Sequence, residues 1–141
     1  MNKTQHKLLS LLLALTTLLG VLTLAACGRE PVVIKDSDTC IVIRVPEDAE
    51  EMTLIDYMNA LKTDGTLDFT VEGGMVTSIG GIENPADFSS CWMLYTSDAD
   101  FSNSAWGTVE YDGVEYGSAI VGAEALVIKP GGLYIWAFMS F

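Results

Sequence analysis

The segment Cys91-Trp92-Met93-Leu94-Tyr95-Thr96 is apolar on both faces when it is placed in a β-strand. A strand with one face in water alternates apolar and polar residues, and this segment does not. Short apolar runs of this kind are typical of strands that are covered on both sides. We therefore expect a central strand here, with the other elements arranged around it.

The residues before this central strand predict further strands and one helix. Residues 39–45 have the period of two that a strand requires. A Thr-x-x-Asp capping box at Thr53 starts a helix over residues 53–62, which Asp64-Gly65 ends. Residues 67–71 then form a strand, and Gly73-Gly74 turns it into a hairpin with residues 75–79.

The residues after the central strand predict two more hairpins. Tyr111-Asp112-Gly113-Val114 indicates the first, because Asp-Gly tolerates the positive φ angles of a type I′ turn. Residues 125–128 and 133–141, joined by the turn at 129–132, indicate a terminal hairpin. About seven or eight strands with one early helix make the fold class α+β. If the aliphatic face of the last strand packs under the helix, the aromatic face must meet more protein or a ligand; that face holds Tyr134, Trp136 and Phe138.

The N-terminus has the pattern of an export signal. Lys3 and Lys7 lie in a positive region, residues 8–22 are apolar, and Leu24-Ala25-Ala26-Cys27 is a cleavage site with a cysteine directly after the cut. This pattern resembles the bacterial lipoprotein signal, in which the Cys27 thiol is lipidated and the peptide before it is removed. Several acyl chains make a stable membrane anchor, whereas one chain does not. The alternatives are an ordinary signal peptide with a chance cysteine, or an uncleaved membrane anchor.

These boundaries predict a signal peptide at 1–26, a lipidated tether at 27–38 and one domain at 39–141. The 115 residues left after cleavage suffice for one domain with a core, but not for two. They carry five basic residues against 19 acidic ones, a net charge of −14. Such a surface repels nucleic acid and anionic lipid headgroups. We expect no nucleic-acid partner, and contact with the cell membrane through the lipid anchor alone, on the extracytoplasmic face.

Catalytic and metal-binding patterns are weak. The only histidine, His6, lies in the predicted signal peptide, which excludes Ser-His-Asp and Cys-His catalysis and histidine zinc sites from the domain. Asp98-Ala99-Asp100 looks like a calcium loop but lacks the EF-hand glycine and glutamate, and Asx turns explain the same residues. Glu110 and Glu115 flank a hairpin turn, where acids usually form a solvated face. We expect no enzyme, no metal and no cofactor.

Cys40 and Cys91 are the two cysteines besides Cys27. Outside the cytoplasm they could form a disulfide, worth about 4 kcal/mol in the chain-entropy model. The alternative is two reduced cysteines that pack as small hydrophobic residues in strands. The sequence leaves both open, because it does not give the distance between their Cα atoms.

Aromatic residues are the candidates for ligand contact. Flat aromatic groups from the central strand, the following loop and the last strand could line a pocket for an organic molecule. Packing in the core is the alternative for Trp92 and Trp136. Trp106, in a loop rich in Ser, Asn and Gly, is the better candidate for an exposed contact. The full set is Trp92, Tyr95, Trp106, Tyr134 and Trp136.

Four segments together form a recognisable set. They are the helix at 53–62, Ile79-Gly80-Gly81-Ile82, Cys91-Trp92-Met93-Leu94-Tyr95, and the ending from Gly117-Ser118-Ala119 through the 129–132 turn to Trp136. Over residues 39–141 this set resembles the transcobalamin-like C-terminal domain family, a group of bacterial surface lipoproteins and exported modules. The resemblance implies a β-grasp-like mixed sheet with β-hairpins packed on one helix, in a single small domain. In animal cobalamin carriers the module closes over a corrinoid beside a helical domain, and these 141 residues hold no such helical domain.

We therefore expect a non-catalytic binding module that captures a small ligand, with a corrinoid as one candidate. The alternative is a protein-interaction or adhesion module at the cell surface, whose sheet edge or aromatic loop docks a transporter subunit or a wall component. A pocket that joins Trp106 to Tyr95, Tyr134 or Trp136 would favour ligand capture. Buried rings without a cleft would favour the interaction module.

Overall fold

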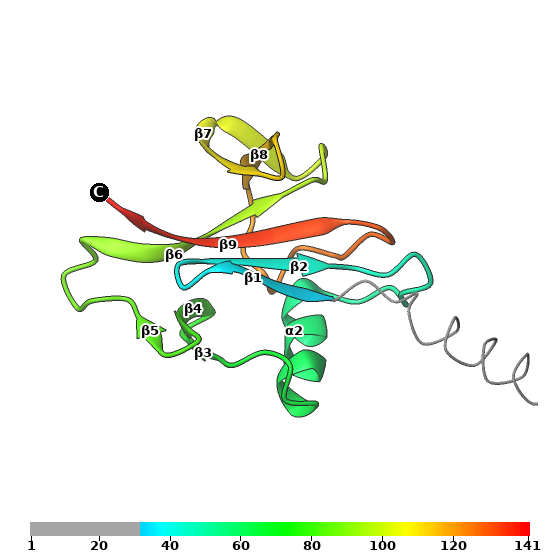
Figure 1. Cartoon of the computed structure of the whole chain (residues 1–141), viewed down its shortest axis with the longest axis horizontal. Coiled ribbons are helices and arrows are strands. Elements are labelled where there is room, and N and C mark those ends of the chain that lie inside the picture. The colour runs from blue at the N-terminus through cyan, green and yellow to red at the C-terminus, as the bar shows by residue number, and fades with distance from the viewer. Residues whose placement is uncertain (1–31) are drawn as a thin grey trace, which may run out of the picture. The chain divides into compact units, whose positions relative to one another are not determined.

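Nine β-strands and one α-helix make up residues 32–141, the part of the chain that the computed structural model describes (Figure 1). The helix is α2 (Leu54–Thr63), and these residues have the predicted α+β composition. The strands are β1 (Val33–Ser37), β2 (Cys40–Arg44), β3 (Phe69–Glu72), β4 (Met75–Ile79), β5 (Ile82–Glu83), β6 (Ser90–Thr96), β7 (Ser102–Tyr111), β8 (Val114–Ala119) and β9 (Leu133–Ser140).

The strands form two antiparallel sheets. The large sheet has the order β1-β2-β9-β6-β8-β7, and the small sheet has the order β3-β4-β5. The position of β6 between β9 and β8 confirms the predicted central strand. The expectation of a mixed sheet is wrong for these residues. β2 and β6 run in the same direction, but β9 lies between them and runs opposite to both, so they do not form a parallel pair.

The helix begins and ends where its caps predict. Thr53 is the N-cap, and its hydroxyl accepts a hydrogen bond from the Asp56 N–H at 3.3 Å. The N–H groups of the first two helical residues are bonded by a distant segment, since Leu54 N donates to Leu126 O and Ile55 N donates to Ala123 O. The N–H groups of the first turn, which have no acceptor within the helix, are therefore bonded both by the Thr53 side chain and by carbonyls of the distant segment. The Asp64 C-cap and Gly65, with φ of 81°, end the helix as predicted.

The predicted strand at residues 125–128 is wrong. This segment is a loop with one isolated bridge, between Thr53 and Val127, and it forms no hairpin with β9. The backbone carbonyl of Leu126 accepts a hydrogen bond from Leu54 N at the start of α2, so it is not available to pair with a neighbouring strand. The side chains of Leu126 and Ile128 are buried, so the apolar pattern that suggested a strand reflects burial in a loop.

The main core lies on one side of the large sheet. Figure 1 shows α2 and the β3–β5 sheet on that side and the β7–β8 hairpin curled over the other. The aromatic face of β9, with Tyr134 and Trp136, packs with α2 in the main core, whereas Ile135 and Ala137 belong to a second cluster on the opposite face. The aliphatic face therefore does not pack under the helix. The large rings fill the space between layers, and the smaller side chains meet the hairpin that folds onto the sheet.

The predicted Gly-Gly and Asp-Gly hairpins are confirmed. Gly73 and Gly74 have φ angles of 57° and 81° between β3 and β4, and Asp112 and Gly113 have φ angles of 49° and 75° between β7 and β8. Two consecutive residues with positive φ are what a type I′ turn requires. The β7–β8 hairpin places Val109, Tyr111 and Tyr116 against the second cluster.

The folded unit starts earlier than predicted. Residues 33–37, assigned to the tether, form β1 and pair with β2, with Val33 opposite Ile43 and Ile34 opposite Val42. The sequence did not indicate this strand, because it is only five residues long and contains two charged residues, Lys35 and Asp36. The predicted signal peptide and Cys27 lie outside the described residues. No helix within residues 32–141 is long and apolar enough to cross a membrane.

Candidate functional site

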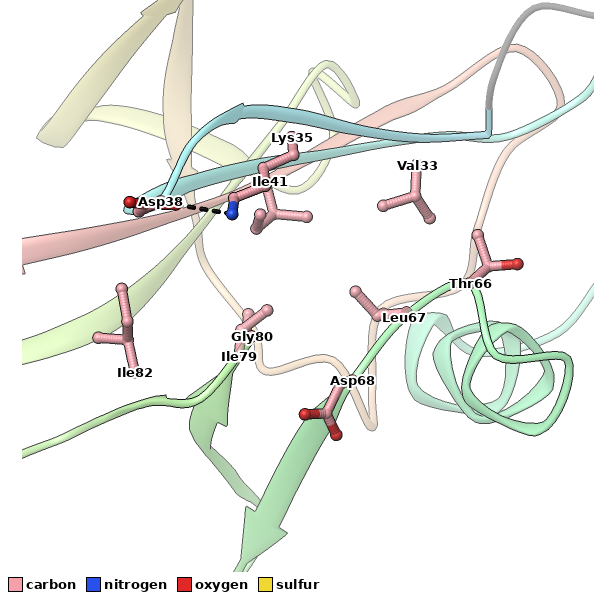
Figure 2. Close-up of a pocket in the computed structure, with 10 residues that line it drawn as sticks. All are labelled: Val33, Lys35, Asp38, Ile41, Thr66, Leu67, Asp68, Ile79, Gly80 and Ile82. Atoms are coloured by element: carbon pink, nitrogen blue, oxygen red, sulfur yellow. Dashed lines mark ion pairs between the residues drawn. The ribbon is translucent and has the colours of Figure 1, made fainter.

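A groove of about 430 Å³ opens between the edge of the large sheet and the small sheet (Figure 2). Its apolar walls come from both sheets and from the segment before β3. Figure 2 shows these side chains directed into the space between the β1–β2 hairpin and the β3–β4 region. The volume lies within the range of about 300–1,000 Å³ that is usual for small-molecule sites. The walls are formed by Val33, Ile41, Leu67, Ile79 and Ile82.

The polar groups of the groove lie at its rim. Lys35 Nζ forms an ion pair with Asp38 Oδ1 at 2.6 Å, and both side chains are exposed. The hydrogen bond from Lys35 lowers the pKa of the Asp38 carboxyl below its usual value. Asp68 and Thr66 lie at the opposite wall. The rim therefore carries two carboxylates and one ammonium, which favours a neutral or cationic polar group on any bound molecule.

Tight turns and two side-chain bonds position the far wall. Gly80 and Gly81 turn β4 into β5 with φ angles of 59° and 84°, which glycine adopts without strain. The Trp92 indole N–H donates to Ile82 O at 2.8 Å and so ties β5 to β6 of the large sheet. Asn84 adds a second tie, because its Oδ1 accepts from Trp92 N at 3.0 Å. The wall at Ile82 is thus fixed to the central strand.

A second cavity, of about 280 Å³, contains two of the predicted aromatic residues. Trp92 and Trp136 line it together with Leu94, and the β4 end and the residues after β8 complete it. We call it the aromatic pocket. Trp92 and Trp136 are 4% and 5% exposed, so each is also a core residue. Trp92 contacts Phe138, with ring centroids 5.4 Å apart.

The other predicted aromatic residues are not brought together. Tyr134 is wholly buried in the main core, and its hydroxyl accepts from the Lys129 N–H at 2.8 Å. Tyr95 is buried in the second cluster, on the opposite face of the sheet. Trp106 is 63% exposed, as predicted, but it belongs to β7 and not to a loop. It lines neither the groove nor the aromatic pocket.

Trp106 is displayed by an irregularity in β7. The pairing with β8 jumps from Asn103 opposite Ser118 to Thr108 opposite Gly117, so residues 104–107 have no partners in the ladder. The Asn103 side chain accepts from Ala105 N at 2.9 Å and so shapes this bulge. A strand that carries a four-residue bulge looks like a loop in sequence, which explains the assignment of Trp106 to one.

Cys40 and Cys91 are free thiols in the structure. They lie on β2 and β6, which flank β9, and they are opposite different residues of it, Ala137 and Met139. Two strand spacings put their Cα atoms about 9.6 Å apart or more, and a disulfide needs less than about 7 Å. The disulfide alternative is therefore wrong. Burial raises the pKa of both thiols, so neither is a reactive thiolate at neutral pH.

The acidic segment after β6 is organised by a lysine. Asp98 is 5% exposed, and its Oδ1 accepts from Asp100 N at 3.0 Å, which is the predicted Asx turn, and from Lys129 Nζ at 2.8 Å. The hydrogen bonds that Lys129 Nζ donates to the carboxylates of Asp98 and Asp100 raise the pKa of Lys129. Glu110 and Glu115 face each other across the β7–β8 hairpin, and both are exposed. Within residues 32–141 no group of acids and cysteines is arranged to hold a metal ion.

Sequence reasoning missed the groove. Its walls are ordinary aliphatic residues whose alternation indicates only burial, and Val33 lies within the predicted tether. The one local signal was Ile79-Gly80-Gly81-Ile82, where two glycines bring two wall residues to the same turn.

Comparisons with family models, with curated proteins and with solved structures found no match to this chain.

Proposed function

We propose that this protein is a lipoprotein, anchored through Cys27 at the extracytoplasmic face of the cell membrane, whose domain binds a small ligand in the groove without catalysis. The groove carries the proposal: it has the volume of a small-molecule site, apolar walls from two sheets, and charged groups at the rim only. Binding of this kind requires preformed shape and a few polar anchors, and no nucleophile or general base.

The expected ligand is a largely apolar molecule with a neutral or cationic polar group. The apolar part would contact Leu67, Ile79 and Ile82 inside the groove. The polar group would lie at the rim, near the carboxylates of Asp38 and Asp68. An anionic ligand would meet an unfavourable rim and a strongly acidic protein.

A corrinoid is the first ligand to test, because the sequence resembles transcobalamin-like domains. The β-grasp-like fold that this resemblance implies belongs to the same proposal. A groove of this volume would hold one edge of a corrinoid macrocycle and not enclose it, so we expect cobinamide, which lacks the nucleotide loop, to bind at least as well as cobalamin.

The test is a titration of the purified protein with cobinamide and with cobalamin, followed by tryptophan fluorescence. The Trp92 indole is hydrogen-bonded to the backbone of Ile82, a residue of the groove wall, so the fluorescence of Trp92 should report on occupancy of the groove. Val33→Phe should weaken binding because it fills the groove, whereas Ile34→Phe, the matched control, changes the neighbouring residue that packs on the opposite face. If neither corrinoid gives saturable quenching, corrinoids are excluded as ligands. If a corrinoid binds and Val33→Phe leaves its affinity unchanged, the groove is excluded as the binding site.

The anchor has its own test. A radioactive or clickable palmitate analogue should label the wild-type protein, and Cys27→Ser should abolish the label and move the protein from the membrane to the soluble fraction. Mass spectrometry of the purified protein should find acylated Cys27 as its first residue. An unmodified Met1 start on protein from the cytosol would contradict the localisation.

The second candidate function is a surface interaction module, and the exposure of Trp106 favours it. The residues around Trp106, from Ser102 to Val109, are uncharged, although the chain carries 19 acidic residues. A transporter subunit or a neutral wall component could contact this bulge. Trp106→Ala should then abolish binding of isolated cell wall in a sedimentation assay, whereas Val114→Ala, an exposed apolar residue of the same hairpin, should not.

A further inference from the structure

Four sulfur-containing side chains lie on the same face of three neighbouring strands. β2, β9 and β6 are adjacent in the large sheet (Figure 1), and Cys40 and Met93 are each paired with Ala137 of β9, from opposite sides. Cys91 precedes Met93 by two residues and is paired with Met139. Directly paired residues share a face, and so do residues two apart on a strand. The sheet therefore collects two thiols and two thioethers on one surface.

Three of these sulfur atoms lie within reach of one another. The Cys91 S–H donates to Met93 Sδ at 3.6 Å, so these two sulfur atoms converge directly. Met139 is opposite Cys91, where cross-strand Cβ atoms are about 4.5–5.5 Å apart, and diagonal to Met93, at about 7–8 Å. A methionine side chain has three rotatable bonds and spans such separations. We call Cys91, Met93 and Met139 the sulfur cluster.

Cys40 lies outside the sulfur cluster. It is two strands away from Cys91 and is displaced from it by two residues along the strand. Standard strand spacing and rise put the two Cα atoms about 12 Å apart, which is too far for both cysteines to bind one ion. Cys40 is therefore a matched thiol on the same face, with which the role of Cys91 can be compared.

The sulfur cluster is open to solvent, although the same face is sealed further along β6. Cys91, Met93 and Met139 are each half-buried. Tyr95, two residues after Met93 on this face, is 3% exposed. Within residues 32–141, β8 pairs with β6 at Tyr95 and Thr96 alone, and the β7–β8 hairpin packs against the cluster that contains Tyr95. The hairpin ends short of the three sulfur side chains, so an ion can reach them from water.

One thiol and two thioethers are ligands for a soft cation. Thiolate and thioether sulfur select Cu(I), whereas Mg²⁺ and Ca²⁺ require oxygen, and structural zinc sites use cysteine and histidine. Burial raises the pKa of the Cys91 thiol, so this group carries its proton at neutral pH. Binding of Cu(I) would break the S–H bond, release that proton to water and form a Cu–S bond, with no transfer of electrons. Because a monovalent ion replaces a proton, the half-buried site would gain no net charge.

We propose that Cys91, Met93 and Met139 form a binding site for one Cu(I) ion, or for Ag(I), which has the same charge and the same preference for sulfur. The site lies on the face of the large sheet opposite to the groove, since Ile41 lines the groove and its neighbour Val42 belongs to the cluster on the sulfur face. The proposal therefore does not depend on the function proposed for the groove.

The first test is a titration of the purified lipidated protein with Ag(I), followed by NMR of carbon-13-labelled methionine methyl groups in chloride-free buffer. The methyl resonances of Met93 and Met139 should shift until one equivalent of Ag(I) is bound. Those of Met58 and Met75 should stay in place. Met58 is wholly buried in the main core, and Met75 is 47% exposed on β4. Met75 is the internal control, because silver that binds any accessible thioether would shift its methyl resonance as well.

The second test measures Cu(I) affinity without oxygen, by competition with a chromophoric Cu(I) chelator. Met93→Leu and Met139→Leu conserve volume but remove the sulfur. Each should weaken binding at least about tenfold, since even residues that only orient a metal ligand are worth about 10–100-fold. Cys91→Ser should weaken binding further, because it removes the anionic ligand. Met75→Leu and Cys40→Ser are the matched controls and should bind as the wild type does. Cys27 is unchanged in every variant, so any contribution from it cancels.

Three results would overturn the proposal. The first is an Ag(I) shift of the Met75 methyl resonance as large as that of Met93. The second is equal Cu(I) affinity of Met93→Leu and the wild type. The third is a loss in Cys40→Ser as large as in Cys91→Ser, which would mean that thiols bind the ion without the thioethers. If Cys91→Ser fails to fold, the methyl shifts of the wild type and the methionine variants still decide the question. None of these results bears on the groove, and Val33→Phe should leave Cu(I) binding unchanged.

Discussion

Replacing Leu126 by alanine should cost about 3 kcal/mol of stability. The side chain of Leu126 is wholly buried in the main core, and its carbonyl accepts from Leu54 N at 2.7 Å. That bond fixes the backbone against the start of α2, so the surroundings cannot collapse into the space that alanine leaves. Leucine-to-alanine changes in cores cost about 2–5 kcal/mol, with more lost where relaxation is limited. At a urea m-value of about 1.5 kcal/mol per M, the midpoint should fall by about 2 M.

The assay is equilibrium unfolding in urea, followed by tryptophan fluorescence and by circular dichroism. Val127→Ala is the control, because Val127 is the next residue and is 39% exposed, and it should cost less than about 0.5 kcal/mol. A loss below about 1 kcal/mol for Leu126→Ala, or equal losses for the two variants, would refute the inference that this loop seals the core.

Three other predictions concern thiols, the helix cap and alkaline pH. Thiol titration of the urea-unfolded, lipidated protein should count two groups, Cys40 and Cys91, and reductant should leave the urea midpoint unchanged, whereas a disulfide would contribute about 4 kcal/mol. Thr53→Ala should cost about 1 kcal/mol in the same unfolding assay, because the Asp56 N–H loses its acceptor, and Thr53→Ser should restore most of it. Burial raises the pKa of Tyr134 above the ordinary value of 10.0, so the unfolded state ionises first. The contribution of Tyr134 to stability should therefore be constant below that pH and be lost as the pH rises through the folded-state pKa. Tyr134→Phe should make this alkaline decline shallower, and an identical decline in the variant would contradict the assignment.

Elements with strong local signals could be predicted from the sequence. The α2 helix follows from the Thr53 cap and the Asp64-Gly65 stop, and the Gly-Gly and Asp-Gly turns follow from the need for positive φ. Each depends on neighbours a few residues away. The loop at 123–128 could not be predicted, because its conformation depends on hydrogen bonds to Leu54 and Ile55, which are distant in sequence.

The sequence could not predict which face of the last strand, β9, packs against the helix. Alternation showed that Tyr134 and Trp136 share a face and that Ile135 and Ala137 share the other, and this is what the structure has. Alternation alone does not say which face meets the helix, because both sides of β9 are covered. Similarly, the cysteines could not be placed until the strand order put β9 between them.

The two cavities have a common structural origin. The large and small sheets share no backbone ladder, so only side chains and a few hydrogen bonds close the space between them. The groove lies where the small sheet faces β1 and β2, and the aromatic pocket lies where β4 faces β6 and the end of β8. Trp92 stands between the two cavities: its ring lines the aromatic pocket, and its N–H holds Ile82, which lines the groove. Cavities form here because two separately twisted sheets cannot match their surfaces along the whole contact. Trp92 and Trp136, which the sequence suggested as ligand contacts, therefore serve first to hold the sheets together, and the groove, the larger of the two openings, is the candidate binding site.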